Sequence, residues 1–163
     1  MKTLLLLRHA KSSWDDPEQA DHDRPLNRRG QRDAPRMGQL LADEHLLPDL
    51  ILCSSARRAQ ETAAKVVESS GCEGQLQIRG DLYQASPATM IEALAAVPRE
   101  AHRVMVIGHN PGLEETLALL TGRQERLPTA ALAQIALKIV NWRDLKPGTR
   151  GELVALWQPR ELS

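Results

Sequence analysis

The stretch Leu4-Leu5-Leu6-Leu7-Arg8-His9 runs from four consecutive leucines directly into an arginine and a histidine. A short apolar run without alternation is typical of a strand buried on both faces, the pattern of central strands in parallel sheets. A second run, Val104-Met105-Val106-Ile107-Gly108-His109, also ends in a histidine. Because open α/β folds form their sites at the carboxyl ends of parallel strands, we expect His9 and His109 to meet at one rim of a sheet.

A third apolar run, Leu50 to Cys53, is followed by Ser54-Ser55-Ala56-Arg57-Arg58-Ala59 and brings arginines to the same expected rim. A neutral imidazole can attack phosphorus and form a covalent intermediate. Guanidinium groups stay charged and donate paired hydrogen bonds, which suits the oxygens of a phosphoryl group. The three strand ends therefore predict a site for a doubly anionic phosphoryl group.

Apolar runs alternate with helical patterns along the chain, which indicates an α/β fold. We predict a three-layer α/β/α sandwich with a central, mostly parallel mixed sheet. The polar stretch Lys11 to Arg29 is expected to be a loop over the site. Beyond residues 4–7, the expected strands are 50–53, 76–78, 104–107, 130–140 and 152–157. The expected helices are 31–44, beginning close to Asp33 because of Pro35, then 57–69 with Ser54 and Ser55 as candidate N-caps, 87–96 and 113–120.

Bulk composition limits the classes of partner. A chain of 163 residues has the size of one domain, so residues 1–163 are expected to form a single unit. Lysine plus arginine equals aspartate plus glutamate at 21 each, and there is no Phe and one Tyr, which argues against nucleic acid as a partner. No segment approaches the roughly 20 apolar residues that cross a bilayer. The expectation is a cytoplasmic protein without a membrane partner.

At this point the sequence resembles a known family. Leu7-Arg8-His9-Ala10 is similar to the Arg-His-Gly signature of the histidine phosphatase superfamily, which has the phosphoglycerate-mutase-like fold. The segment from Ser54 to Ala63 resembles its second signature, Ser-Pro-x-x-Arg-Ala-x-Gln-Thr, and picks out Arg58 rather than Arg57. Gly108-His109-Asn110 is similar to its strand-terminal Gly-His. The resemblance covers most of the chain, in the right order.

The resemblance implies that His9 is the phosphorylated nucleophile, with Arg8, Arg58 and protonated His109 completing the phosphate pocket. The short length and the segment Asp23 to Gly30 look most like the compact SixA-type phosphohistidine phosphatases. Those members remove phosphate from a histidine on a signalling protein. The implied partners are thus a phosphorylated protein or a small phosphorylated substrate, with inorganic phosphate as product and no cofactor.

Two departures from the family pattern bear on the chemistry. Ala10 stands where glycine usually follows the nucleophile, which is acceptable only if that position does not need a positive φ. Larger members carry a glutamate after the third strand as proton donor, and the segment from Asp81 to Pro87 contains none. General acid help is worth about 10²- to 10⁴-fold for a poor leaving group. Its absence favours a P–N substrate, although Asp81, Asp15 or Asp16 can also be considered as the acid.

Several further residues have two interpretations each. Lys11 either touches phosphate or a partner, or is an exposed loop lysine. Asn110 either orients His109 or binds phosphate, or caps the next helix, and Ser54 either joins the site or caps helix 57–69. The basic residues Arg24, Arg28, Arg29, Arg32 and Arg36 are expected to be a solvated helix face.

Two other activities remain open besides phosphohistidine hydrolysis. One is a phosphatase or mutase acting on a small phosphomonoester, and the other is a catalytically weak module that binds phosphoproteins. A metal site is not expected, because the histidines outside the motifs and the two cysteines have no ligand-like spacing.

Overall fold

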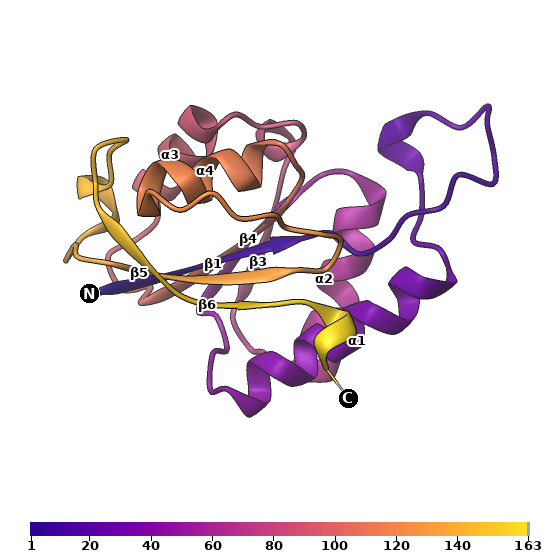
Figure 1. The fold of residues 1–163 in the computed structure, drawn as a ribbon, viewed down its shortest axis with the longest axis horizontal. Coiled ribbons are helices and arrows are strands. Elements are labelled where there is room, and N and C mark those ends of the chain that lie inside the picture. Colours follow the sequence, from indigo (N-terminus) through magenta and orange to yellow (C-terminus); the bar gives the residue numbers. More distant parts are fainter. Residues whose placement is uncertain (163) are drawn as a thin grey trace.

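The computed structural model describes residues 1–162, and its framework is a mixed sheet between helices (Figure 1). The strands are β1 (Lys2–Arg8), β2 (Leu50–Ser54), β3 (Gln75–Arg79), β4 (Arg103–Gly108), β5 (Leu132–Leu137) and β6 (Gly151–Trp157). The α-helices are α1 (Arg28–Asp43), α2 (Arg57–Ser70), α3 (Pro87–Ala95) and α4 (Gly112–Thr121). Short 3₁₀ turns cover Asp21–Asp23, Gly80–Leu82, Trp142–Asp144 and Pro159–Glu161.

The strand order is β3-β2-β4-β1-β5-β6. The first four strands in this order pair in parallel, whereas β5 and β6 are antiparallel to their neighbours. β1 and β4 therefore lie side by side at the centre and point the same way. The expected mostly parallel mixed sheet is confirmed.

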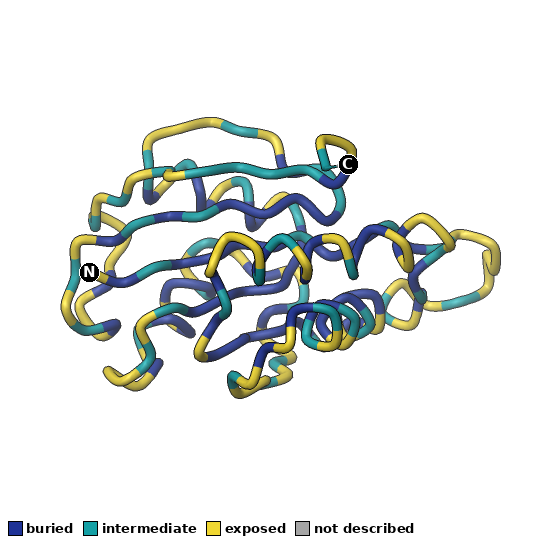
Figure 2. Tube along the Cα trace, turned by 90° about the horizontal axis from the view of Figure 1, so that it is seen from below, coloured by how far each residue is buried: buried dark blue, intermediate teal, exposed yellow. Residues whose placement is uncertain are grey.

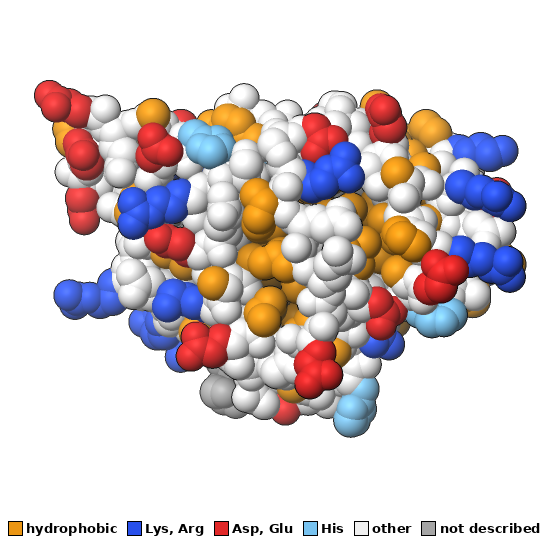
Figure 3. All heavy atoms as spheres, turned by 180° about the vertical axis from the view of Figure 1, so that it is seen from behind, with side chains coloured by type: hydrophobic (Ala, Val, Ile, Leu, Met, Phe, Trp, Pro, Cys, Tyr) orange, Lys and Arg blue, Asp and Glu red, His pale blue; other side chains and the backbone are white. Residues whose placement is uncertain are grey.

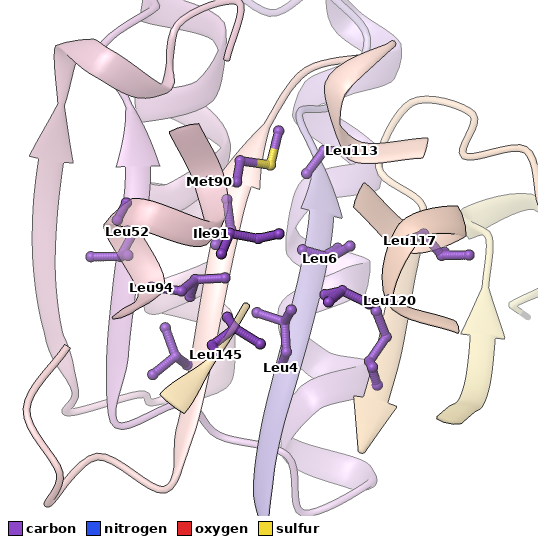
Figure 4. Close-up of a cluster of buried hydrophobic side chains, with 14 of the residues drawn as sticks. Leu4, Leu6, Leu52, Met90, Ile91, Leu94, Leu113, Leu117, Leu120 and Leu145 are labelled. Carbon is purple, nitrogen blue, oxygen red and sulfur yellow. The ribbon is translucent and has the colours of Figure 1, made fainter. Parts of the chain in front are cut away.

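The four leucines of β1 are buried because each face of the sheet carries a helical layer. Leu4 and Leu6 pack in the cluster that includes α3 and α4 (Figure 4), whereas Leu5 and Leu7 pack in the cluster that includes α1 and α2. The central strands are buried along most of their length, while the edge strand β6 is only partly covered (Figure 2). This arrangement confirms the three-layer α/β/α sandwich.

The start of α1 differs from the sequence expectation. The helix begins at Arg28 rather than near Asp33, because the Asn27 side chain caps it by accepting a hydrogen bond from the Gly30 N–H at 2.9 Å. Pro35 consequently lies inside the helix, not in its first turn. Proline donates no backbone hydrogen bond at this position. Next to it, α1 packs closely on α2, where a Cβ at Gly38 would overlap Ser69 and the Val66 carbonyl.

Other boundaries move by fewer residues. The N-cap residue of α2 is Ala56 without a side-chain cap, so the assignment of Ser54 or Ser55 as cap is wrong. β5 starts at Leu132 rather than residue 130, because Ala130 has a φ of 62° and its N–H bonds to the carbonyls of Arg8 and His9. Gly71 and Gly122 end α2 and α4 in the left-handed conformation.

The loop of residues 9–27 projects from the end of β1 (Figure 1). Arg24 is buried there, contrary to the solvated face expected of it: it donates to Ser12 Oγ at 2.8 Å and lies 3.5 Å over the Trp14 ring. Asp15, Asp16 and Glu18 are exposed on this loop, and acidic side chains gather at the projecting end of the molecule (Figure 3, left). Among the helices described for residues 1–162, none is both long and apolar enough to cross a membrane.

Candidate functional site

The sheet brings three strand ends together at its carboxyl rim. Arg8 at the end of β1 pairs in register with Gly108 at the end of β4, and Cys53 of β2 pairs with Ile107. The residues that follow, His9 and His109, therefore emerge side by side. Their ring centroids are 5.0 Å apart, so the two histidines meet at one rim of the sheet, as their positions at strand ends led us to expect.

The surroundings of His9 favour an unprotonated imidazole, a form that can act as a nucleophile. Its Nδ1 lies 2.8 Å from the Ala10 carbonyl, an acceptor, so we assign the hydrogen to Nδ1 and the lone pair to Nε2. Burial is the main cause that lowers the pKa of His9, to about 3, and the charges of Arg58 and Arg8, and of His109 when it is protonated, act in the same direction. The ring is consequently neutral at pH 7.

Arg58, in the first turn of α2, links the two rings. Its Nε lies 3.4 Å from His9 Nε2, and its Nη2 lies 3.4 Å from His109 Nδ1. The side chain is buried, and its planar guanidinium directs Nε at His9 and Nη2 at His109. The structure thus brings together three of the four residues that the motifs select.

The position of Arg58 is fixed by a residue that the sequence did not reveal. Asp21 accepts from Arg58 Nη1 through its main-chain carbonyl at 2.8 Å and from Nη2 through its carboxylate at 3.1 Å. The same carboxylate accepts from the Tyr83 hydroxyl at 2.5 Å and pairs with Arg24 at 3.1 Å. The Tyr83 hydrogen bond, followed by the arginines, lowers the pKa of Asp21 to about 2, so Asp21 is charged at neutral pH.

His109 is held from the other side by Ser54. The distance from His109 Nε2 to Ser54 Oγ is 2.7 Å, and because Arg58 donates to Nδ1, we assign the ring hydrogen to Nε2. Burial, followed by the charge of Arg58, lowers the pKa of His109 to about 4. Surrounded by protein groups alone, the ring is neutral at pH 7, whereas a phosphoryl dianion beside it would favour the protonated form.

Arg8 lies beside this group without contacting it directly. Its side chain points to the α4 side of β1, where Nη1 donates to the Leu127 carbonyl at 3.1 Å. Burial lowers the pKa of Arg8, Glu114 opposes that shift, and the charge of Arg8 reaches both histidines. Arg8 therefore contributes positive potential in this conformation rather than a hydrogen bond to either ring.

Of the three remaining candidate residues in the described part of the chain, Asn110, Lys11 and Ser54, only Ser54 makes a side-chain hydrogen bond to the group of the two histidines and Arg58, and this bond is to His109. Asn110 bonds through its amide to the Glu114 carboxylate at 3.0 Å and the Leu127 carbonyl at 2.8 Å, and it accepts from the Glu114 N–H at 3.3 Å. It therefore holds the start of α4 and makes no hydrogen bond to His109. Lys11 is half-buried and makes no side-chain hydrogen bond within residues 1–162. Ser54 contacts the site and does not cap α2.

The carboxylates considered as proton donors lie elsewhere. Asp81 pairs with Arg79 at 2.7 Å on the surface, and Asp15 and Asp16 are exposed on the projecting loop. Thr62 is a further residue that the sequence did not single out for the site: its Oγ1 accepts from the Ala10 N–H at 3.0 Å and ties the turn after His9 to α2. Within residues 1–162, no three His, Cys, Asp or Glu side chains are grouped so as to hold a metal ion.

Comparison with known proteins gives concordant results. A family model described as the histidine phosphatase superfamily (branch 1) matches residues 4–86. An uncharacterized protein of Mycobacterium tuberculosis (strain H37Rv) is 35% identical over 166 residues, covering 94% of this chain and 100% of the relative.

Two solved structures, each provisionally assigned as the phosphohistidine phosphatase SixA, superpose closely. The one from Nakamurella multipartitia has a TM-score of 0.86 and 28% identity, covering 97% of this chain and 96% of that one. The one from Agrobacterium tumefaciens has a TM-score of 0.84 and 30% identity, covering 97% and 98%.

Proposed function

Because the chain belongs to the histidine phosphatase superfamily, we propose that it is a phosphatase that removes phosphate from a phosphohistidine of a signalling protein through a phosphoryl-His9 intermediate. The observation that carries the proposal is the position of the Arg58 guanidinium. It lies between His9 Nε2 and His109 Nδ1, 3.4 Å from each. A nucleophilic nitrogen, a fixed cation and a second imidazole thus face one small volume.

The proposed cycle has two displacements. His9 Nε2 attacks phosphorus and forms the new Nε2–P bond, while the P–N bond of the substrate breaks. The electron pair of that bond returns to the substrate imidazole, which is protonated beforehand at its other nitrogen and so leaves as the neutral ring. Water then attacks phosphorus, the electron pair of the Nε2–P bond returns to Nε2, and inorganic phosphate leaves with the water oxygen, the displaced proton passing to phosphate or solvent. Arg58, Arg8 and a His109 protonated in response to the dianion stabilise charge on the phosphoryl oxygens.

The preference for a P–N bond rests on the proton donors. Asp21, the carboxylate beside Arg58, is already ionised because its pKa is about 2, so it is a poor general acid at neutral pH. An alkoxide leaves poorly without such an acid, whereas the imidazole of phosphohistidine leaves more easily. The similarity to the two structures assigned as SixA supports the same substrate class.

Rapid acid-free quenching of a reaction with a ³²P-labelled phosphohistidine peptide tests the intermediate. Label should appear on the wild-type chain and on the control His102→Ala, whose side chain is exposed, and not on His9→Ala. A folded His9→Ala variant with full activity would rule out His9 as nucleophile.

Comparison of kcat/KM for the phosphohistidine peptide, p-nitrophenyl phosphate and sugar phosphates tests the substrate class. A strong preference for the esters would overturn the phosphohistidine proposal in favour of a small-phosphomonoester enzyme. Phosphate binding without turnover of any of these compounds would instead indicate a phosphoprotein-binding module.

A further inference from the structure

A cavity of about 330 Å³ opens at the carboxyl rim of the sheet, on the β5–β6 side of Arg8. Four arginines from four separate segments line it: Arg8 from β1, Arg29 from α1, Arg126 from the segment before β5, and Arg160 from the turn after β6. His109 follows β4, which flanks β1 on the side away from β5, and its ring centroid lies 5.0 Å from that of His9. This arginine cavity is thus a neighbour of the candidate catalytic site, with Arg8 between the two.

The charge of the arginine cavity is not neutralised by the residues around it. Glu114 is the carboxylate in its lining, and its Oε2 already accepts from the Asn110 amide at 3.0 Å and the Leu127 N–H at 2.7 Å. Arg29 pairs with Asp33, but none of the ion pairs within residues 1–162 involves Arg126 or Arg160. The whole chain has a formal net charge of zero, so this excess is local.

Two buried polar atoms of the lining residues also lack partners. Arg8 Nε and Gln158 Oε1 make no hydrogen bond within the described chain, although both atoms are shielded from solvent. Buried polar groups are normally hydrogen-bonded, and an unpaired guanidinium N–H is matched best by an anionic oxygen. Gln158 Oε1 can accept from a water that accompanies such an anion.

We propose that the arginine cavity binds a second anionic group of the substrate, a carboxylate or a phosphate, while the phosphoryl group is at His9. This inference rests on the proposed function, since it places the first anion at the candidate catalytic site. Arginine forks bind both kinds of oxyanion in the same bidentate way. The volume lies at the small end of the range of roughly 300–1,000 Å³ typical of ligand sites, which suits one acidic group and its water.

Equilibrium binding of phosphonates tests the proposal without turnover. The probes are alkylphosphonates with one to four methylenes, and the same chains ending in a carboxylate or in a second phosphonate. The test variant is the double substitution Arg126→Gln and Arg160→Gln, both exposed at the arginine cavity. The matched control is Arg99→Gln and Arg143→Gln, which removes the same charge from exposed positions outside the cavity lining.

At one chain length or more, wild-type protein and the control should bind a doubly anionic probe at least tenfold more tightly than the matched alkylphosphonate. The cavity double variant should lose that advantage while its affinity for alkylphosphonates changes less than twofold. Whether the carboxylate or the phosphonate series shows the larger gain identifies the anion.

Absence of any gain in the wild type, equal losses for both probe classes, or the same loss in the control would each overturn the second-anion site. Turnover of a phosphohistidine peptide by the wild type is measured separately. Failure of that assay with a retained gain for doubly anionic probes would contradict the proposed function alone.

Discussion

Replacement of Asp21 by asparagine is predicted to impair catalysis much more than stability. The substitution keeps the shape of the side chain and the main-chain carbonyl that accepts from Arg58 Nη1 at 2.8 Å. It removes the negative charge 3.1 Å from Arg58 Nη2 and weakens the hydrogen bond from Tyr83. The Arg58 side chain can then turn away from His9, and the assay detects this as a decrease in the rate of hydrolysis.

The expected effects on stability and on catalysis differ in size. The Asp21 side chain is 43% exposed, and an ion pair with this degree of solvent exposure contributes at most about 1 kcal/mol to the free energy of unfolding. A hydrogen bond to a charged group that orients a catalytic cation is worth about 1.5–3 kcal/mol, which corresponds to roughly a 10- to 100-fold decrease in rate. The decrease should fall mainly on kcat, because the role proposed for Arg58 is to stabilise charge that develops in the transition state.

The assay is steady-state hydrolysis of a phosphohistidine peptide, with thermal unfolding measured on the same samples. Asp23→Asn is the matched control, since the Asp23 side chain is 67% exposed and its one ion pair within residues 1–162 is with His22, at 3.7 Å. Asp21 raises the pKa of His109, so its replacement should also shift the pH optimum to lower pH, a change that a purely structural role would not produce. A folded Asp21→Asn variant within twofold of wild-type kcat, or an equal loss in Asp23→Asn, would refute the reasoning.

Two further predictions concern stability. The pKa values of His9 and His109 are lowered to about 3 and about 4 in the folded chain, so below about pH 6.5 the unfolded chain binds more protons than the folded chain. In urea unfolding, the free energy of unfolding should therefore fall by about 2 kcal/mol for each histidine between pH 7 and pH 5. A flat profile, or the same slope after both residues are changed to glutamine, would contradict this. Thr62→Val should leave the buried Ala10 N–H without its acceptor and cost about 1–3 kcal/mol in urea unfolding, more than Thr121→Val; equal costs would argue against the Thr62 contact.

The sequence predicted the central sheet because its strands carry an unambiguous pattern. The apolar runs that end at His9 and His109 are too short for helices. Their residues are buried on both faces of the sheet, so every position in the run is apolar and the pattern is easy to recognise. Their parallel pairing then follows from the alternation with helices, and it brings the histidines together as predicted. The motif selected Arg58 correctly. Its side chain reaches the site because Arg58 lies in the first turn of α2, which begins three residues after the end of β2.

The sequence could not predict residues whose place depends on loop geometry. Nothing in the spacing of Asp21 and Arg58 indicates contact, since Asp21 lies in an irregular loop whose path the sequence does not determine. Arg24 was misjudged for the same reason: its charge predicts solvent exposure, but stacking on Trp14 and the pairing with Asp21 make burial favourable. The start of α1 depended on the Asn27 cap, which outweighed the signal from Pro35.

The contacts of Asp21 also give the projecting loop a part in the site rather than a place beside it. Arg58 directs Nε at His9 and Nη2 at His109, and it also donates from Nη1 and Nη2 to Asp21, which in turn is held by Arg24 and Tyr83. Orientation of a catalytic cation within a fraction of an ångström requires such support. Because Arg24 and Tyr83 both hold the Asp21 carboxylate, the loop and the segment that follows β3 together support the position of Arg58.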